Sequence, residues 1–158
     1  MKEDIGAFKS LKRLHTSLLT GLSIFAIISL IVAGKEPYHI NDETFSRIVQ
    51  VVATVFSMAA IFIGFNLFKR SIVRIRLRNS PGVKRMEHYR RSCIIWWSFN
   101  LGPAFFAALC YIWTDNLSFF FLSCMHLLIL LLFRPRKENI SLLLNLNSDD
   151  ISQLEKQR

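Results

Sequence analysis

The sequence lacks the residue patterns of most active sites, and it has few acidic residues of any kind. Only 11 of its 158 residues are Asp or Glu, and none of these lies inside a long apolar run. There is no glycine-rich phosphate loop, no His-Glu-x-x-His pair, and no nucleophile spaced to act with a base. We therefore predict a protein that is not an enzyme and that holds neither a cofactor nor a metal.

Cysteine is equally scarce. The three cysteines are Cys93, Cys110 and Cys124, and no two of them form a Cys-x-x-Cys pair. All three lie within apolar runs, where we expect them to pack as small apolar side chains. This pattern argues against a disulfide framework and against a structural zinc site.

Long apolar runs dominate the remainder of the sequence. Hydrophobic residues make up 52% of the chain, which is high for a soluble domain. A helix of about 20 apolar residues crosses a hydrocarbon core of about 30 Å. Four runs, at 14–34, 48–68, 93–113 and 117–133, therefore predict membrane spans. The predicted fold is all-α: one domain, 1–158, that forms a four-transmembrane-helix bundle from two in–out–in helical hairpins.

A basic loop at 69–91 orients these spans. It contains nine basic residues and one acid, Glu87. The nine are Lys69, Arg70, Arg74, Arg76, Arg78, Lys84, Arg85, Arg90 and Arg91. Short basic loops stay on the cytoplasmic side of a membrane. Of the 20 Lys and Arg residues, only Lys35 and Arg47 then lie outside. We predict a bacterial cytoplasmic (inner) membrane protein with both termini in the cytoplasm.

The same basic residues have a second interpretation as a binding surface. The formal net charge is +9, but the bases cluster at the ends of apolar runs. Such clusters contact anionic lipid headgroups, so we expect the bilayer as a partner and no nucleic acid. Topology alone is the alternative explanation.

Phe68, Ile72 and Ile75 keep helical spacing into the loop, which predicts that the helix of the second run continues there. The tail at 134–158 is amphipathic enough to dock on another surface but not to span a membrane.

Small residues recur in the first and third runs. Ser17, Gly21, Phe25 and Ala26 match Ser98, Gly102, Phe106 and Ala107 at a constant offset of 81. The match favours a parallel internal repeat, and chance among common residue types is the alternative. Small residues four apart let helix backbones approach closely in lipid. The predicted helix-packing positions are Ser17, Gly21, Ala60, Gly64, Ser98 and Gly102.

A few polar residues lie inside the runs. His126 is the ionisable side chain nearest the centre of a span, and Asn100 lies just before Pro103, which removes a backbone donor. The three residues define a candidate intramembrane polar site, and structural hydrogen bonds to neighbouring helices are the alternative. Because Asn100 lies about seven residues from the inner start of its span, we expect it and His126 to have separate partners. Trp96 and Trp97 are expected to be interface anchors.

One stretch carries a resemblance to a known group. It runs from Tyr89 through Cys93-Ile94-Ile95-Trp96-Trp97 to Leu101-Gly102-Pro103-Ala104-Phe105-Phe106, and Arg134-Pro135 with Lys137-Glu138 follows the fourth run. This pattern resembles a family of uncharacterised four-span bacterial membrane proteins, which implies the fold and no activity. The third run is also faintly similar to the carboxylate-bearing helix of rotary-ATPase proteolipid subunits. The position of the carboxylate is Leu101 here, so proton carriage of that kind is not expected.

Three functional hypotheses remain open at this point. The leading one is a self-associating protein, or an accessory subunit whose partners are other membrane subunits. The second is a small transporter or channel with a polar path near Asn100, Pro103 and His126. The third is a membrane enzyme acting on lipophilic substrates, whose arginine loop would bind an anionic cofactor such as a thiol tripeptide.

Overall fold

The computed structural model describes residues 4–33, 35, 42–77 and 81–146, and these form five helices and no strand. The helices are α1 (Asp4–Ala33), α2 (Glu43–Leu77), α3 (Gly82–Thr114), α4 (Leu117–Leu132) and α5 (Lys137–Leu144). The all-α prediction is confirmed for this part of the chain. The four apolar runs lie almost entirely within the first four helices.

Three of the described helices are long and apolar enough to cross a membrane, at Lys9–Ala33, Glu43–Leu77 and Lys84–Thr114. This composition is that of a membrane protein. Helix α4 is apolar too, but it has only 16 residues. At 1.5 Å per residue it is about 24 Å long, which is shorter than a hydrocarbon core of about 30 Å.

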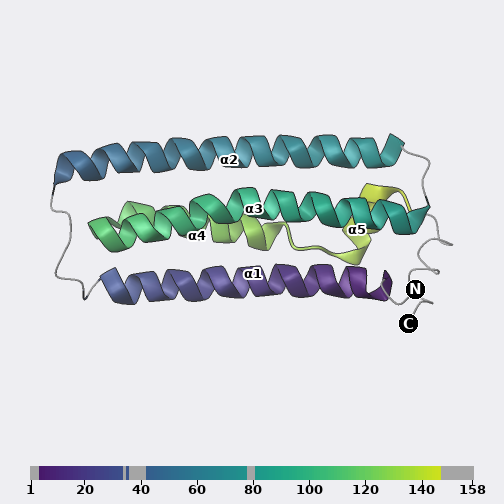
Figure 1. The fold of residues 1–158 in the computed structure, drawn as a ribbon, viewed down its shortest axis with the longest axis horizontal. Coiled ribbons are helices and arrows are strands. Elements are labelled where there is room, and N and C mark those ends of the chain that lie inside the picture. Colours follow the sequence, from purple (N-terminus) through teal and green to yellow (C-terminus); the bar gives the residue numbers. More distant parts are fainter. Residues whose placement is uncertain (1–3, 34, 36–41, 78–80, 147–158) are drawn as a thin grey trace.

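Helix α3 is the centre of the arrangement. Figure 1 shows α1 and α2 on opposite sides, with α3 between them and α4 alongside α3. Helix α3 packs against all three of these helices. In its most apolar 18-residue segment, 50% of the residues are buried, compared with 22% in the corresponding segments of α1 and of α2. Fully buried alanines at Ala104, Ala107 and Ala108 leave room for these neighbours.

The hairpins differ from the expected pair. Helices α3 and α4 pack directly on each other, but α1 and α2 each pack chiefly on α3. Helices α1 and α2 therefore follow each other in the chain, but they do not pack on each other as a hairpin would. The reason is competition for α3, because its central position separates the two helices that flank it (Figure 1).

The turn between α3 and α4 has a defined local cause. Asp115 ends α3 in the left-handed conformation, at φ 51°, and its backbone N–H donates to the Tyr111 carbonyl. Asn116 then caps α4, because its side-chain oxygen accepts from the Ser118 backbone N–H at 3.0 Å. The Asn116 Nδ2 also lies 3.4 Å from the Gln50 Oε1 of α2. The turn is thereby tied to the start of α2.

A second packed region lies at the basic end of the helices. Helix α2 continues to Leu77, and Ile72 and Ile75 are buried while Arg70 and Arg74 are exposed. This confirms the predicted extension of the second run. Helix α5 completes the region with Ile140 and Leu144, which are 3% and 0% exposed. The predicted tail continues to 158, but 147–158 lies outside the described residues.

Candidate functional site

The interior of the helices contains one reciprocal polar pair. The Nδ1 of His126 lies 2.6 Å from the Oδ1 of Asn100, and the Nδ2 of Asn100 donates to the His126 carbonyl oxygen at 3.1 Å. The side chains are 1% and 0% exposed for Asn100 and His126. The expectation of separate partners is therefore wrong. Helix α3 begins at Gly82, so Asn100 lies near the middle of its helix, as His126 does in α4.

The pair determines which ring nitrogen of His126 carries the proton. An amide oxygen only accepts hydrogen bonds, so the Nδ1 of His126 must donate to Asn100. The opposite nitrogen, Nε2, is then an acceptor in the neutral ring. It is buried and has no hydrogen-bond partner among the described residues. The Nδ1 of His126 is thus hydrogen-bonded to Asn100, and the Nε2 is an acceptor without a partner among the described residues.

A second histidine ties α1 to α4. The Nε2 of His15 donates to the Leu130 carbonyl oxygen at 2.9 Å, and the ring packs on Trp97 at 5.0 Å between centroids. The Arg134 amide, four residues after Leu130, donates to Leu131 instead. His15 therefore bonds one of the carbonyls that a helix end leaves without a regular partner.

His15 stands at the start of the first apolar run, where an interfacial residue is expected, so its position in the sequence does not indicate this role. The signal was its helical phase. His15 lies on the same face of α1 as Leu11 and Leu22, at spacings of four and seven, and all three are buried.

The two neighbouring tryptophans are core residues. Trp96 and Trp97 are 2% and 1% exposed, so the expectation that they anchor the interface is wrong. Trp96 packs on Phe65 of α2 and on Phe133 at the end of α4. Helices on several sides of α3 cover both rings, which removes them from lipid. Pro103, the third residue of the candidate polar site, is also buried in α3.

The small residues divide into two sets. A Cβ at Gly64 would lie 2.8 Å from the Phe99 Cβ and 3.0 Å from the Trp96 ring, so α2 and α3 approach closely there. Ala60, one turn earlier, is 6% exposed. A Cβ at Gly21 or Gly102 would meet nothing within 4 Å.

Ser17 and Ser98 are exposed, as are the two open glycines. Within the described residues, none of these four positions is buried against a neighbouring helix. Any close approach that they serve would be an approach between molecules.

Two of the central basic residues hold the tail helix. The Arg76 guanidinium donates to the Leu143 carbonyl at 2.6 Å and to the Leu142 carbonyl at 3.0 Å. Arg85 lies 3.3 Å from the carbonyls of Leu144 and Asn145. These are the last carbonyls of α5, where positive charge is favourable.

The remaining bases of the central loop are placed differently. Arg91 pairs with Glu87 at 2.6 Å. Arg90 is half-buried, and Arg78 lies outside the described residues. The other exposed bases among the described residues of this loop are Lys69, Arg70, Arg74 and Lys84. These four side chains are available to contact solvent or headgroups.

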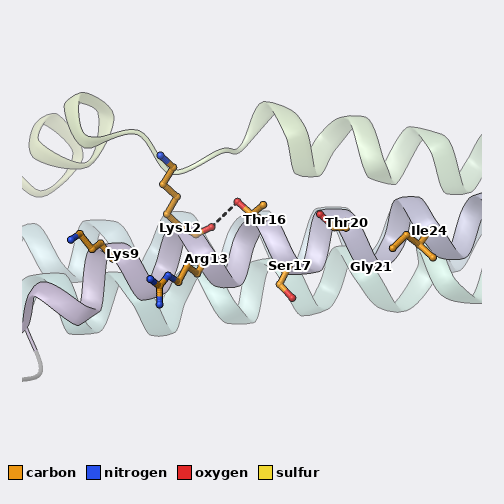
Figure 2. Close-up of a pocket in the computed structure, with 8 residues that line it drawn as sticks. All are labelled: Lys9, Lys12, Arg13, Thr16, Ser17, Thr20, Gly21 and Ile24. Carbon is orange, nitrogen blue, oxygen red and sulfur yellow. Dashed lines mark hydrogen bonds between the residues drawn. The ribbon is translucent and has the colours of Figure 1, made fainter.

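An open depression of about 710 Å³ lies against the exposed face of α1, and all the described residues that line it belong to this helix. Figure 2 shows Lys9, Lys12 and Arg13 toward one end of it and Ile24 at the other. The lining between them is small or weakly polar: Thr16, Ser17, Thr20 and Gly21. None of these eight residues is acidic.

Comparison of the chain with protein-family models, with curated proteins and with solved structures gives no match. Functional inference therefore depends on the geometry alone.

Proposed function

We propose that this chain is a four-span protein of the bacterial cytoplasmic membrane, with a structural interior, that works by associating with a second copy of itself. The reciprocal bonding of Asn100 and His126 carries the structural interior, and the open space at Gly102 carries the association. Both side chains bond protein atoms across the α3–α4 contact. Such bonds tie helices together in lipid, and they do not require a substrate.

The contacts at both ends of α4 support a fourth crossing. At its start, Asn116 contacts Gln50 of α2, near the end opposite the basic loop. At its other end, Leu130 bonds His15, which follows Lys12 and Arg13. A helix of about 24 Å that reaches from one level to the other crosses most of the hydrocarbon core, and local thinning accommodates the remainder.

Charge supports the orientation. The starts of α1 and α3, the end of α2 and helix α5 lie at one end in Figure 1, and the bases of the central loop gather there. That end would face the cytoplasm under the positive-inside rule.

The exposed small residues of α3 support self-association. Ser98 and Gly102 are exposed within the described part of the chain, and a Cβ at Gly102 would have open space around it. The apolar side chains beside them remain exposed too, including Ile95 at 49% and Leu109 at 40%. Two copies that meet at this face would bring their backbones close, which is how small residues stabilise helix pairs in lipid.

Disulfide crosslinking in membranes tests the association. The native cysteines are replaced by alanine, and Ser98→Cys is compared with Leu128→Cys, which is 59% exposed on α4. We expect oxidation to link Ser98→Cys into dimers and to leave Leu128→Cys monomeric. Equal linking at both sites would indicate random collision, and no linking at Ser98 would overturn the dimer.

A second candidate function rests on the open acceptor of His126. A small transporter would use the buried, unpartnered Nε2 as a contact on a polar path. Ion or solute flux through purified protein in liposomes separates this candidate from the first. We expect no flux above that of protein-free liposomes. Flux that is lost in His126→Phe, with folding retained, would establish the transporter instead.

A further inference from the structure

Helices α2 and α4 carry three buried side-chain atoms that have no hydrogen-bond partner among the described residues. They are the Oγ of Ser57, the Oγ of Ser123 and the Nε2 of His126, and the three residues are 1%, 1% and 0% exposed. A serine inside a helix often bonds a carbonyl of the preceding turn, as Ser29 bonds Ala26 at 2.8 Å. Ser57 and Ser123 do not, so each hydroxyl remains able to donate and to accept.

Two printed contacts fix the register of α2 against α4. Near the start of both helices, Asn116 Nδ2 lies 3.4 Å from Gln50 Oε1. Near the opposite end of α4, the rings of Phe133 and Phe65 are 6.3 Å apart between centroids. The members of these two pairs are 66 and 68 positions apart in the sequence. The two helices therefore run in the same direction, and residues about this far apart lie at the same level.

That register brings the three unpartnered atoms to one level of the helix bundle. Ser57 is 66 positions before Ser123 and 69 positions before His126. Ser123 and His126 are three residues apart, so they lie on neighbouring turns of one face of α4. All three side chains are buried within the thickness of about one helical turn.

Helix α3 adds a further acceptor at this level. The bond from Asn100 to α4 and the contact of the Phe106 ring with Phe56 of α2 place this part of α3 beside the same layer. Pro103 lies midway, and it has no N–H, so the carbonyl of Phe99 lacks its regular helical donor. The fully buried side chains of α3 nearby are small: Ala104 and Ala107.

We propose that Ser57, Ser123 and His126 bind a water molecule enclosed between α2, α3 and α4. The Nε2 of His126 can only accept, because the Nδ1 donates to Asn100, so the water donates to it. The two serine hydroxyls bond the water as well, and the Phe99 carbonyl is an acceptor for its second hydrogen. A buried water typically makes about three hydrogen bonds to such groups. The proposal depends on neither the membrane insertion nor the self-association proposed above.

An ion is the competing occupant of this site. The apolar runs contain no Asp or Glu to balance a cation and no Lys or Arg to balance an anion. The described residues also contain no group of three His, Cys, Asp or Glu that could hold a metal. An unbalanced charge in a protein interior is very costly. Water is neutral and both donates and accepts, so it matches the two hydroxyls and the acceptor nitrogen.

Solid-state nitrogen NMR of the full chain tests the proposal. The protein carries isotope-labelled histidine in lipid bilayers, magnetisation is transferred from water protons to the ring nitrogens, and His126→Phe assigns the signal. We expect the unprotonated Nε2 of His126 to receive magnetisation early, at the lower chemical shift of a nitrogen that accepts a hydrogen bond. The shift of an unbonded nitrogen would overturn the proposal. So would a bonded Nε2 that receives nothing from water.

Serine variants test the partners of the water. Ser57→Ala and Ser123→Ala each remove one hydroxyl, so each should weaken the transfer from water to His126 and move the Nε2 shift toward that of an unbonded nitrogen. The matched control is Ser29→Ala, because Ser29 is 0% exposed and its hydroxyl bonds its own helix. It should leave both signals unchanged. Equal changes in all three variants would overturn the assignment, and so would an unchanged signal in Ser57→Ala or in Ser123→Ala.

Exchange of cations separates water from an ion. The thermal midpoint of the full chain in detergent is measured in sodium, potassium and choline chloride at equal ionic strength. We expect the same midpoint in all three salts, because a water molecule is present in each. A midpoint that is higher in sodium or potassium for the wild type, but not for Ser57→Ala, would assign the site to a cation and overturn the water.

Discussion

His126 and Asn100 exchange two hydrogen bonds across the contact of α3 and α4. The His126 Nδ1 donates to the Asn100 Oδ1 at 2.6 Å, and the Asn100 Nδ2 donates to the His126 carbonyl at 3.1 Å. The two bonds together fix the tautomer of the ring and the orientation of the amide. Replacing either Asn100 or His126 by an apolar residue therefore leaves a buried polar group of the other residue without its partner.

The pair should show energetic coupling. We expect Asn100→Leu and His126→Phe each to lower the free energy of unfolding by about 1–2 kcal/mol, because each leaves a buried polar group unpaired. The double variant should cost about 1 kcal/mol less than the sum of the single variants, in the range of interhelical bonds in membranes. Unfolding in detergent, followed for all four proteins, measures this difference. The control is Asn66→Leu, since Asn66 bonds the Phe62 carbonyl of its own helix. Additive effects at Asn100 and His126 would contradict the observed contact.

The glycines should differ sharply in their tolerance of a side chain. Gly64→Leu should destabilise the protein by about 1–3 kcal/mol or prevent folding, because its new atoms would overlap Phe99 and Trp96. Gly102→Leu should leave the monomer as stable as the wild type, since it points into open space. Thermal unfolding in detergent compares them. Similar losses at both sites would mean that Gly102 is packed in the monomer after all.

The elements of the fold were predictable because they depend on local chemistry. Apolar runs of helical length and the helical phase of Ile72 and Ile75 appear in the structure where the sequence places them. Each of these features is determined by residues close together in the chain. Element type therefore follows from composition and spacing.

The lateral arrangement was not predictable in the same way. In a helix that is apolar on every side, periodicity does not mark the buried face, so Trp96 and Trp97 could not be distinguished from interface anchors. The level of Asn100 relative to His126 depends on where α3 begins, and this start lies in the basic loop rather than at the edge of the apolar run. The docking of α5 on Arg76 and Arg85 depends on residues about 60 positions apart.

The two arginines at α5 should control the exposure of that helix. Arg76→Gln with Arg85→Gln removes the donors to the last carbonyls of α5, and we expect faster amide hydrogen exchange across the helix, by about ten-fold or more. The charged hydrogen bonds contribute about 1.5–3 kcal/mol each, which is ample for that change. The control is Arg74→Gln, an exposed base on the same helix as Arg76. Equal exchange in all three proteins would mean that burial of Ile140 and Leu144 holds α5 without the arginines.

The path of α4 can be decided by labelling single cysteines in intact cells. Lys35→Cys, Lys84→Cys and Arg136→Cys are each exposed positions in a background without native cysteine. An impermeant thiol reagent added outside should label Lys35→Cys and leave Lys84→Cys unlabelled until the cells are opened. Arg136 follows α4, and the end of α4 lies beside His15, close to the bases of α1. We therefore expect Arg136→Cys to behave as Lys84→Cys does. Labelling of Arg136→Cys from outside, with Lys84→Cys still protected, would place the end of α4 on the outer side and leave three crossings. Labelling of Lys84→Cys and Arg136→Cys from outside, with Lys35→Cys protected, would reverse the orientation of the whole chain.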